Sequence, residues 1–214
     1  ARPSVCKRHY DAKALKNEYC HETALRILIA RIARTTALLE KSITPVASMW
    51  FEHSVKVVVR VEEGATKADE TLKHLGFLNY CSVCLTTRET KLPESNECCG
   101  KKTEWAGPLW LGDCSDEGFL KKMLSANHER EYSDKKALEK TIALLVEELG
   151  SPAFYYDLHE WSSVLKKPAA KTEDVVTALR AQGFKASKTH YSGSGVKTNA
   201  SSKEFKRVLE TNKY

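Results

Sequence analysis

The chain has 214 residues, of which 42% are apolar and 29% are charged, enough for one large or two modest domains with buried cores. No apolar run approaches the roughly 18 residues that cross a bilayer, and no charged start followed by an apolar stretch marks a secretory signal. These features exclude a membrane-spanning chain and favour a soluble, intracellular protein. The first residue is Ala1 rather than Met, as expected of a processed chain or of a piece of a longer one.

Positive charge is concentrated toward the C-terminus. The formal net charge is +6, and residues 151–214 hold eleven Lys or Arg against six Asp or Glu, which gives +5 of that total. A basic segment of this kind suits a polyanionic partner such as a nucleic acid. Many basic faces are merely solvated, so charge alone leaves both interpretations open.

The first part of the chain predicts helices and strands in alternation. Apolar residues at helical spacing predict a helix over Asn17–Leu39, and valine-rich stretches predict strands over Ile43–Met49 and Val55–Val61. A short helix is expected over Ala65–Leu75, ended by Gly76.

Residues 77–112 lack long periodic segments, predict only short strands and contain most of the cysteines. Of the seven cysteines, four lie close together in the sequence: Cys81, Cys84, Cys98 and Cys99. In an intracellular protein such a cluster favours zinc, which takes four thiolate or imidazole ligands. Cys81 and Cys84 form a Cys-x-x-Cys turn, but Cys98 and Cys99 are adjacent, and one local turn does not easily direct both to one ion. Reduced, partly buried thiols are the alternative.

Helices resume at Asp116–Asn127 and Asp134–Leu149, with a domain boundary expected near residues 113–133. Further helices are predicted over Leu158–Leu165 and Thr172–Ala181, the second capped by the Thr172 hydroxyl. Strands over Phe184–Tyr191 and Val196–Ala200 follow, and then a last helix over Lys203–Asn212. Helix, helix, hairpin is the order of a winged helix.

The predicted hairpin of this module carries many potential phosphate donors. Strand alternation places Lys185, Ser187, Thr189 and Tyr191 on one face and Lys188 and His190 on the other, and Lys197 and Thr198 return on the partner strand. Such side chains make most phosphate contacts in nucleic-acid complexes. The alternative is a solvated hairpin with one aromatic face in the core.

Two other sets of residues have competing interpretations. His21 and Glu22 at the start of the first long helix could serve in acid–base chemistry or could cap the helix, and Glu22 could instead pair with Arg26 at the i, i+4 spacing. Trp105 and Trp110 flank Gly107-Pro108, where packing is expected rather than base stacking.

A series of stretches in collinear order covers nearly the whole chain. They are Tyr19-Cys-His-Glu-Thr-Ala-Leu-Arg-Ile-Leu, Thr44-Pro-Val-Ala-Ser, Val57-Val-Val-Arg-Val, Gly64-Ala-Thr-Lys-Ala-Asp, Tyr80-Cys-Ser-Val-Cys, Gly107-Pro-Leu-Trp-Leu-Gly, Tyr155-Tyr-Asp-Leu-His-Glu, Ala178-Leu-Arg-Ala-Gln-Gly-Phe, Lys188-Thr-His-Tyr and Gly195-Val-Lys-Thr-Asn-Ala. The series resembles the C-terminal half of the tRNA (guanine-N2) dimethyltransferase family, which methylates guanine 26 of tRNA.

The resemblance implies a mixed α/β fold in three parts. Residues 1–76 would be the C-terminal remnant of a Rossmann-like methyltransferase domain, residues 77–115 a zinc-knuckle-like insert, and residues 116–214 a tRNA-binding domain, winged-helix-like from about residue 152. The residues that bind S-adenosylmethionine and perform catalysis would lie upstream of Ala1, so none is assigned in this chain.

The expected ligands are therefore tRNA, a zinc ion on the four clustered cysteines, and S-adenosylmethionine bound mostly outside this chain. Candidate RNA contacts are Lys56, Arg60, Lys185, Lys188, Thr189, His190, Lys197 and Thr198. The resemblance implies an intracellular protein, cytoplasmic or in a nucleus or organelle. The alternatives are a non-catalytic tRNA- or ribosome-associated protein derived from that family, and an unrelated zinc-stabilised interaction domain.

Overall fold

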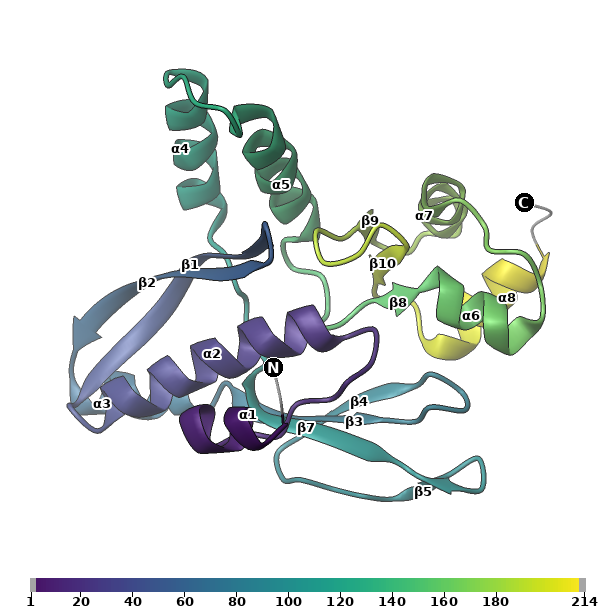
Figure 1. Ribbon diagram of the computed structural model, residues 1–214, viewed down its shortest axis with the longest axis horizontal. Coiled ribbons are helices and arrows are strands. Elements are labelled where there is room, and N and C mark those ends of the chain that lie inside the picture. The colour runs from purple at the N-terminus through teal and green to yellow at the C-terminus, as the bar shows by residue number, and fades with distance from the viewer. Residues whose placement is uncertain (1–2, 212–214) are drawn as a thin grey trace.

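The computed structural model describes residues 3–211, which form a mixed α/β fold of eight helices and ten strands. A long helix crosses the body of the molecule, a helical hairpin rises from one side, and three short helices form one end (Figure 1). The expected mixed α/β fold is confirmed at this level.

The N-terminal part is built on one long β-hairpin. Strands β1 (Lys41–Phe51) and β2 (Ser54–Glu63) pair antiparallel, and both turn residues, Glu52 and His53, have positive φ, as a two-residue hairpin turn requires. Helix α2 (Cys20–Ala37) packs against one face of this hairpin. Helix α1 (Pro3–Tyr10) was not predicted, and helix α3 (Ala65–Leu72) follows the hairpin.

The sequence prediction placed the end of the short helix at Gly76, and this was wrong. Helix α3 ends at Leu72, and Gly76 lies inside strand β3 (Leu75–Tyr80). A Cβ atom at Gly76 would lie 2.4 Å from Leu111 Cδ1 and 2.7 Å from the Thr90 carbonyl oxygen. The glycine is therefore required by close packing within the sheet rather than by a helix end.

The middle of the chain forms two small sheets. Strand β3 lies between β4 (Thr87–Thr90) and β7 (Glu104–Trp110). Strands β5 (Glu97–Cys98) and β6 (Lys101–Lys102) form a separate two-stranded hairpin.

Helices α4 (Glu117–His128) and α5 (Lys135–Glu148) form the projecting hairpin. Asp116 caps α4, accepting a hydrogen bond of 2.8 Å from the Phe119 amide. The hairpin has its own small hydrophobic core, in which Leu120, Ile142 and Leu145 pack with Ala47 and Met49 of β1. This core attaches the helical hairpin to the N-terminal part of the chain.

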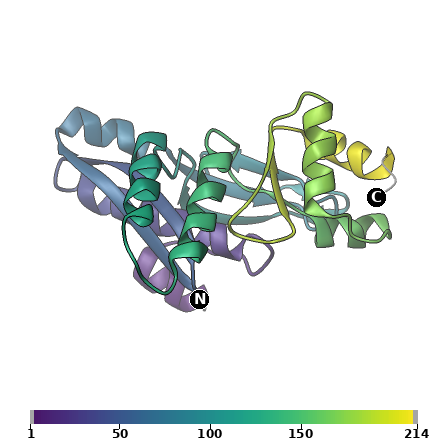
Figure 2. The same cartoon turned by 90° about the horizontal axis from the view of Figure 1, so that it is seen from above.

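The C-terminal module contains a three-stranded sheet and three helices. In chain order they are β8 (Tyr156–Asp157), α6 (Leu158–Leu165), α7 (Thr172–Ala181), β9 (Ala186–Lys188), β10 (Gly195–Thr198) and α8 (Ser202–Thr211). The spatial order of the strands is β8-β10-β9. Seen from above, these elements extend the molecule along its long axis beyond α5 (Figure 2).

Helices α6 and α7 have the predicted bounds. The neighbouring strands and the cap of α7 differ from the prediction. The strands are shorter than expected, and Asn212, the expected last helical residue, lies outside the described residues. Thr172 does not cap α7. It is the first residue of the helix, and its hydroxyl donates to the Gly193 carbonyl oxygen at 2.9 Å, while Lys171 occupies the N-cap position.

One large hydrophobic cluster runs through the described chain from Cys6 to Leu209. It joins α2, the β3–β7 sheet and the C-terminal module. These three parts are far apart in the sequence, but they share one hydrophobic core and pack against one another.

Candidate functional site

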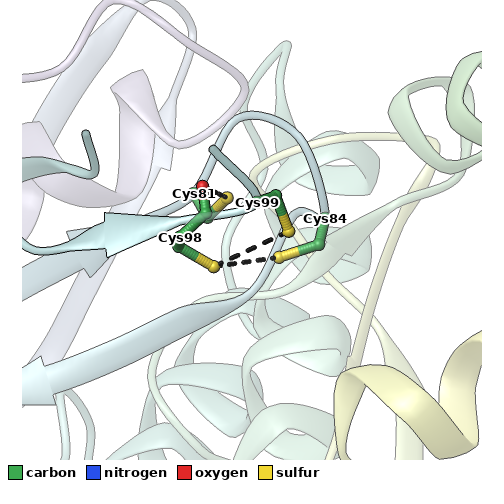
Figure 3. A group of neighbouring side chains, drawn as sticks. All are labelled: Cys81, Cys84, Cys98 and Cys99. Carbon is green, nitrogen blue, oxygen red and sulfur yellow. Dashed lines mark hydrogen bonds between the residues drawn. The ribbon is translucent and has the colours of Figure 1, made fainter. Parts of the chain in front are cut away.

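The four clustered cysteines converge in space. Cys81 and Cys84 come from the turn after β3, and Cys98 and Cys99 from the tip of the β5–β6 hairpin (Figure 3). The four sulfur atoms all lie within 4.8 Å of one another. The Cys84 and Cys98 sulfurs are 3.7 Å apart, and those of Cys98 and Cys99 are 3.8 Å apart.

Adjacent cysteines reach one point because of the turn between β5 and β6. Cys98 pairs with Lys101, which leaves Cys99 and Gly100 as the two turn residues. Both have positive φ, 53° at Cys99 and 74° at Gly100, which is the geometry of a tight hairpin turn. The left-handed backbone at Cys99 turns its side chain back toward that of Cys98. The expectation that one local turn does not easily direct both thiols to one ion is therefore wrong for this hairpin.

The arrangement fits a tetrahedral metal site. Four sulfurs at a Zn–S distance of about 2.3 Å in a tetrahedron lie about 3.8 Å apart, and this matches the two sulfur–sulfur distances above. Burial raises the pKa of Cys84, but hydrogen bonds from Thr86 and from neighbouring thiols lower that pKa, and the same thiol contacts raise the pKa of Cys98, so one proton is shared within the cluster. The residues present thus form a possible four-cysteine metal site.

Sequence reasoning missed one residue beside this cluster. Thr86 lies 3.3 Å from the Cys84 sulfur, and its hydroxyl oxygen is 3.1 Å from that of Ser202 at the start of α8. A hydroxyl two residues after a Cys-x-x-Cys turn was the signal available. The remaining three cysteines, Cys6, Cys20 and Cys114, are free and lie outside the group.

The predicted RNA contact Lys197 is buried rather than exposed. Its side chain is 4% exposed, and its ammonium nitrogen lies 2.8 Å from Glu22 Oε1 on α2. Glu22 also accepts from Arg26 Nε at 2.9 Å and from the Phe154 amide at 2.9 Å. Arg26 donates in turn to the Trp110 carbonyl oxygen at 2.8 Å.

This network stabilises the charged form of Glu22. Burial alone raises the pKa of Glu22, but the charges of Lys197 and Arg26 and the hydrogen bonds from Lys197 and Phe154 lower the pKa to about 2. The predicted capping role of Glu22 is therefore wrong, and the alternative Glu22–Arg26 pair is present with Lys197 as a third member. His21 stacks on Trp50, with 4.1 Å between ring centroids, and its Nδ1 lies 3.2 Å from the Tyr191 carbonyl oxygen.

Three other predicted RNA contacts also point inward. Thr189 and Thr198 are buried. The His190 side chain is 2% exposed, and both its Nδ1 and its backbone amide lie 2.7 Å from Glu148 Oε1 at the end of α5. In this fold, therefore, Lys197, Thr189, Thr198 and His190 do not present their side chains to a partner at the surface, which argues against their predicted contact with RNA.

The remaining predicted contacts are accessible. Lys56 and Arg60 lie on the exposed side of β2, and Lys185 is exposed. Lys188 is half-buried and forms an ion pair with Glu173. Their contact with RNA stays a prediction.

The two tryptophans lie in packed positions. Trp110 is buried, and its indole nitrogen donates to the Asp113 carbonyl oxygen at 2.9 Å. Trp105 packs edge-on against Phe77, and the Lys13 ammonium lies 4.5 Å from its ring centre. These contacts fit the packing interpretation.

Across residues 3–211, we find no helix with the length and apolar character needed to span a bilayer.

Comparison with known proteins places these features in a family. Residues 1–210 match the family profile described as N2,N2-dimethylguanosine tRNA methyltransferase. The tRNA (guanine(26)-N(2))-dimethyltransferase of Methanobrevibacter smithii is 39% identical over 211 residues, which is 96% of this chain and 54% of that protein. The protein of the same description from Pyrococcus abyssi is 32% identical over 213 residues and 55% of its length.

A solved structure gives the same result. The complex of Trm1 from Pyrococcus horikoshii with S-adenosyl-L-methionine superposes with a TM-score of 0.88 and 32% identity, covering 96% of this chain and 54% of that one. The chain thus spans about half the length of the curated relatives it matches. With a profile match over nearly its whole length, the chain belongs to the N2,N2-dimethylguanosine tRNA methyltransferase family.

Proposed function

We propose that this chain supplies the tRNA-holding half of a tRNA (guanine-N2)-dimethyltransferase that modifies guanine 26. The observation that carries the proposal is the collinear match, in sequence and in fold, to relatives of that description over 96% of the chain. A tRNA substrate implies an intracellular location, with the cytoplasm as the main compartment.

The chemistry explains why a separate holding part is useful. The exocyclic amine of guanine is a weak nucleophile because its lone pair is delocalised into the ring. Its nitrogen must therefore be held in line with the methyl group that S-adenosylmethionine supplies. A base in a stacked region must also be turned out of the helix to reach such a pocket. In our proposal the donor-binding and catalytic residues belong to the part of the relatives that this chain does not span.

The proposed division of the chain follows its elements. Helix α2 and the β1–β2 hairpin would be the last helix and hairpin of a Rossmann-like domain within residues 1–76. Residues 77–115 would be the metal-bearing insert, and residues 116–214 the tRNA-binding part. The strand order β8-β10-β9 with α6 and α7 before the hairpin supports a winged helix from about residue 152.

We further propose that the four-cysteine cluster binds zinc in a structural role. Two sulfur–sulfur distances of 3.7 and 3.8 Å support this. With four protein ligands the site is closed, and a closed site holds structure rather than binding substrate. A metal there would tie the β5–β6 hairpin to the turn after β3.

The predicted contacts that remain accessible to RNA in this fold are Lys56, Arg60, Lys185 and Lys188. The buried members have a different role in this proposal. Lys197 and His190 pair with Glu22 and Glu148, so they position the hairpin and do not bind phosphates.

Binding and methyl-transfer measurements on the 214-residue chain test the proposal. The chain should bind folded tRNA more tightly than a single-stranded homopolymer of equal length, with an affinity that falls as salt rises. Incubated with tRNA and labelled S-adenosylmethionine, it should transfer no label. Equal attraction to tRNA and to the homopolymer would contradict the tRNA-holding role, and label in the tRNA would contradict the proposed location of the catalytic residues.

A further inference from the structure

The β9–β10 hairpin, the wing of the C-terminal module, faces the body of the molecule. It lies beside the end of α5 (Figure 1). Lys197 contacts Glu22 on α2, His190 contacts Glu148 on α5, and the Tyr191 carbonyl oxygen contacts His21 on α2. In many winged helices this hairpin lies along the nucleic acid. Here three separate polar contacts hold it against the body of the molecule.

The helix that precedes this hairpin is also a poor phosphate binder. Glu173 and Asp174 lie in the first turn of α7, where the helix dipole would otherwise attract an anion. Glu173 is in addition paired with Lys188. Lys188 and Lys171 offset these carboxylates, so this end of α7 offers no net positive charge to an RNA backbone, which favours another surface of the module.

Helix α8 presents such a surface. Its buried residues are Phe205, Val208 and Leu209. At about 100° per residue, the opposite side carries Lys206, Glu210, Lys203 and Arg207 in one stripe, and all four residues are exposed. Cations three and four residues apart on a helix lie about 5–6 Å from one another, so one stretch of backbone can meet them together.

The charges on this stripe are only partly neutralised within the chain. Lys206 lies 3.7 Å from Glu210, and Arg207 contacts the neutral side chain of Gln182. Among residues 3–211, Lys203 has no carboxylate within ion-pair distance. The ammonium of Lys167, from the loop after α6, lies 3.3 Å from the Glu210 carbonyl oxygen and adds a fourth cation beside the helix.

Elements of the fold keep this surface in place. Ser201 and Glu204 form a capping box at the start of α8, in which the Ser201 amide donates to Glu204 at 2.7 Å and the Glu204 amide donates to the Ser201 hydroxyl at 3.3 Å. The aromatic ring of Phe205 packs against Tyr156 and Trp161. A rigid, amphipathic helix with its cations outward needs little reorganisation to bind a polyanion.

We propose that the exposed face of α8, formed by Lys203, Lys206 and Arg207 with Lys167 beside it, is the main phosphate-contact surface of the C-terminal module and takes the backbone of tRNA. The inference rests on the proposed tRNA-holding function. It assigns the contact to the end of the molecule farthest from α3 rather than to the wing (Figure 1).

The test compares three variants of the 214-residue chain for tRNA binding over a series of salt concentrations. The α8 variant carries Lys203→Gln, Lys206→Gln and Arg207→Gln, and the wing variant carries Lys185→Gln and Lys188→Gln. In the third, Glu210→Gln removes the acid from the stripe. Every substitution is at a solvent-accessible position, and circular dichroism with a thermal melt checks that each variant folds.

Log affinity for tRNA falls as log salt rises. We expect this fall to be less steep in the α8 variant by about 2 to 3 units of slope, since each lost phosphate contact removes about one. Glu210→Gln should strengthen binding at every salt concentration. The wing variant should change the slope by less than about one unit. A folded α8 variant with an unchanged slope, or a wing variant with the larger loss, overturns the inference and leaves the proposed function standing. Absence of tRNA binding by the unmodified chain overturns both.

Discussion

The ammonium of Lys197 on β10 lies 2.8 Å from the carboxylate of Glu22 on α2, although 175 residues separate them in the sequence. Arg26 holds the same carboxylate oxygen at 2.9 Å, and all three side chains are almost completely buried. The contact fixes the C-terminal module against the long helix of the N-terminal part.

Breaking this contact should destabilise the fold strongly. Glu22→Gln leaves two buried cations without a counter-charge, and such losses cost about 3–5 kcal/mol. Urea unfolding of the variant measures the cost. The matched control is Glu173→Gln, which breaks the more exposed pair with Lys188 and should cost less than about 1 kcal/mol. Similar costs for the two variants would contradict the role assigned to Glu22.

The same network predicts how the free energy of unfolding depends on pH. The pKa of Glu22 is lowered from its ordinary value of 4.5 to about 2 in the folded chain. Its contribution to stability is therefore fully present above about pH 4.5 and is lost as pH falls through about 2. The difference in free energy of unfolding between the unmodified chain and Glu22→Gln should shrink over that window. A difference that stays constant down to about pH 2.5 would show that Glu22 does not titrate with this shift.

The sequence predicted helices better than it predicted which way the wing faces. Helices α6 and α7 have the expected bounds because apolar spacing and terminal residues are local signals. Strand alternation indicates which side chains share a face, but it does not say which face is inward. Lysine and histidine at positions 197 and 190 look like surface residues until their carboxylate partners, Glu22 and Glu148, are known.

The cysteine cluster shows a similar limit. The four residues were predicted correctly as one group from their spacing and type, and their sulfurs do converge. What the sequence left open was the pairing of Cys98 with Cys99. The deciding feature is the positive φ at Cys99 in a two-residue turn, and a non-glycine residue in that conformation is uncommon enough that sequence patterns rarely predict it.

The metal proposal gives a direct prediction for Cys99. The chain purified without chelator should hold about one zinc per chain, and Cys99→Ser should reduce the metal content as much as Cys84→Ser, since a structural site uses all four thiolates. Elemental analysis and the absorption of a cobalt-substituted sample measure this. Cys20→Ser is the control, because Cys20 lies outside the cluster. Full metal content in Cys99→Ser would mean that Cys99 is not a ligand.

Metal removal should also act on stability. Because a metal that binds only the folded chain adds to its stability, chelation should lower the melting temperature of the unmodified chain. Variants that already lack a cluster cysteine should respond less. Equal melting temperatures before and after chelation, with loss of the metal verified, would contradict a structural role.

Two glycines of the wing provide a last test of how tightly the hairpin is held. A Cβ atom at Gly195 would lie 2.4 Å from Thr189 Cγ2 and 2.8 Å from Tyr155 Cδ2, whereas one at Gly193 has no heavy atom within 4 Å. Gly195→Ala must therefore displace buried groups and should cost about 1–3 kcal/mol. Gly193→Ala should be neutral or stabilise by up to about 1 kcal/mol, since it mainly restricts the unfolded chain. Thermal unfolding of the two variants separates these expectations. Equal melting temperatures for Gly195→Ala and Gly193→Ala would show that the hairpin can move at little cost in stability. The buried positions of Thr189 and Lys197 would then no longer argue against their contact with RNA.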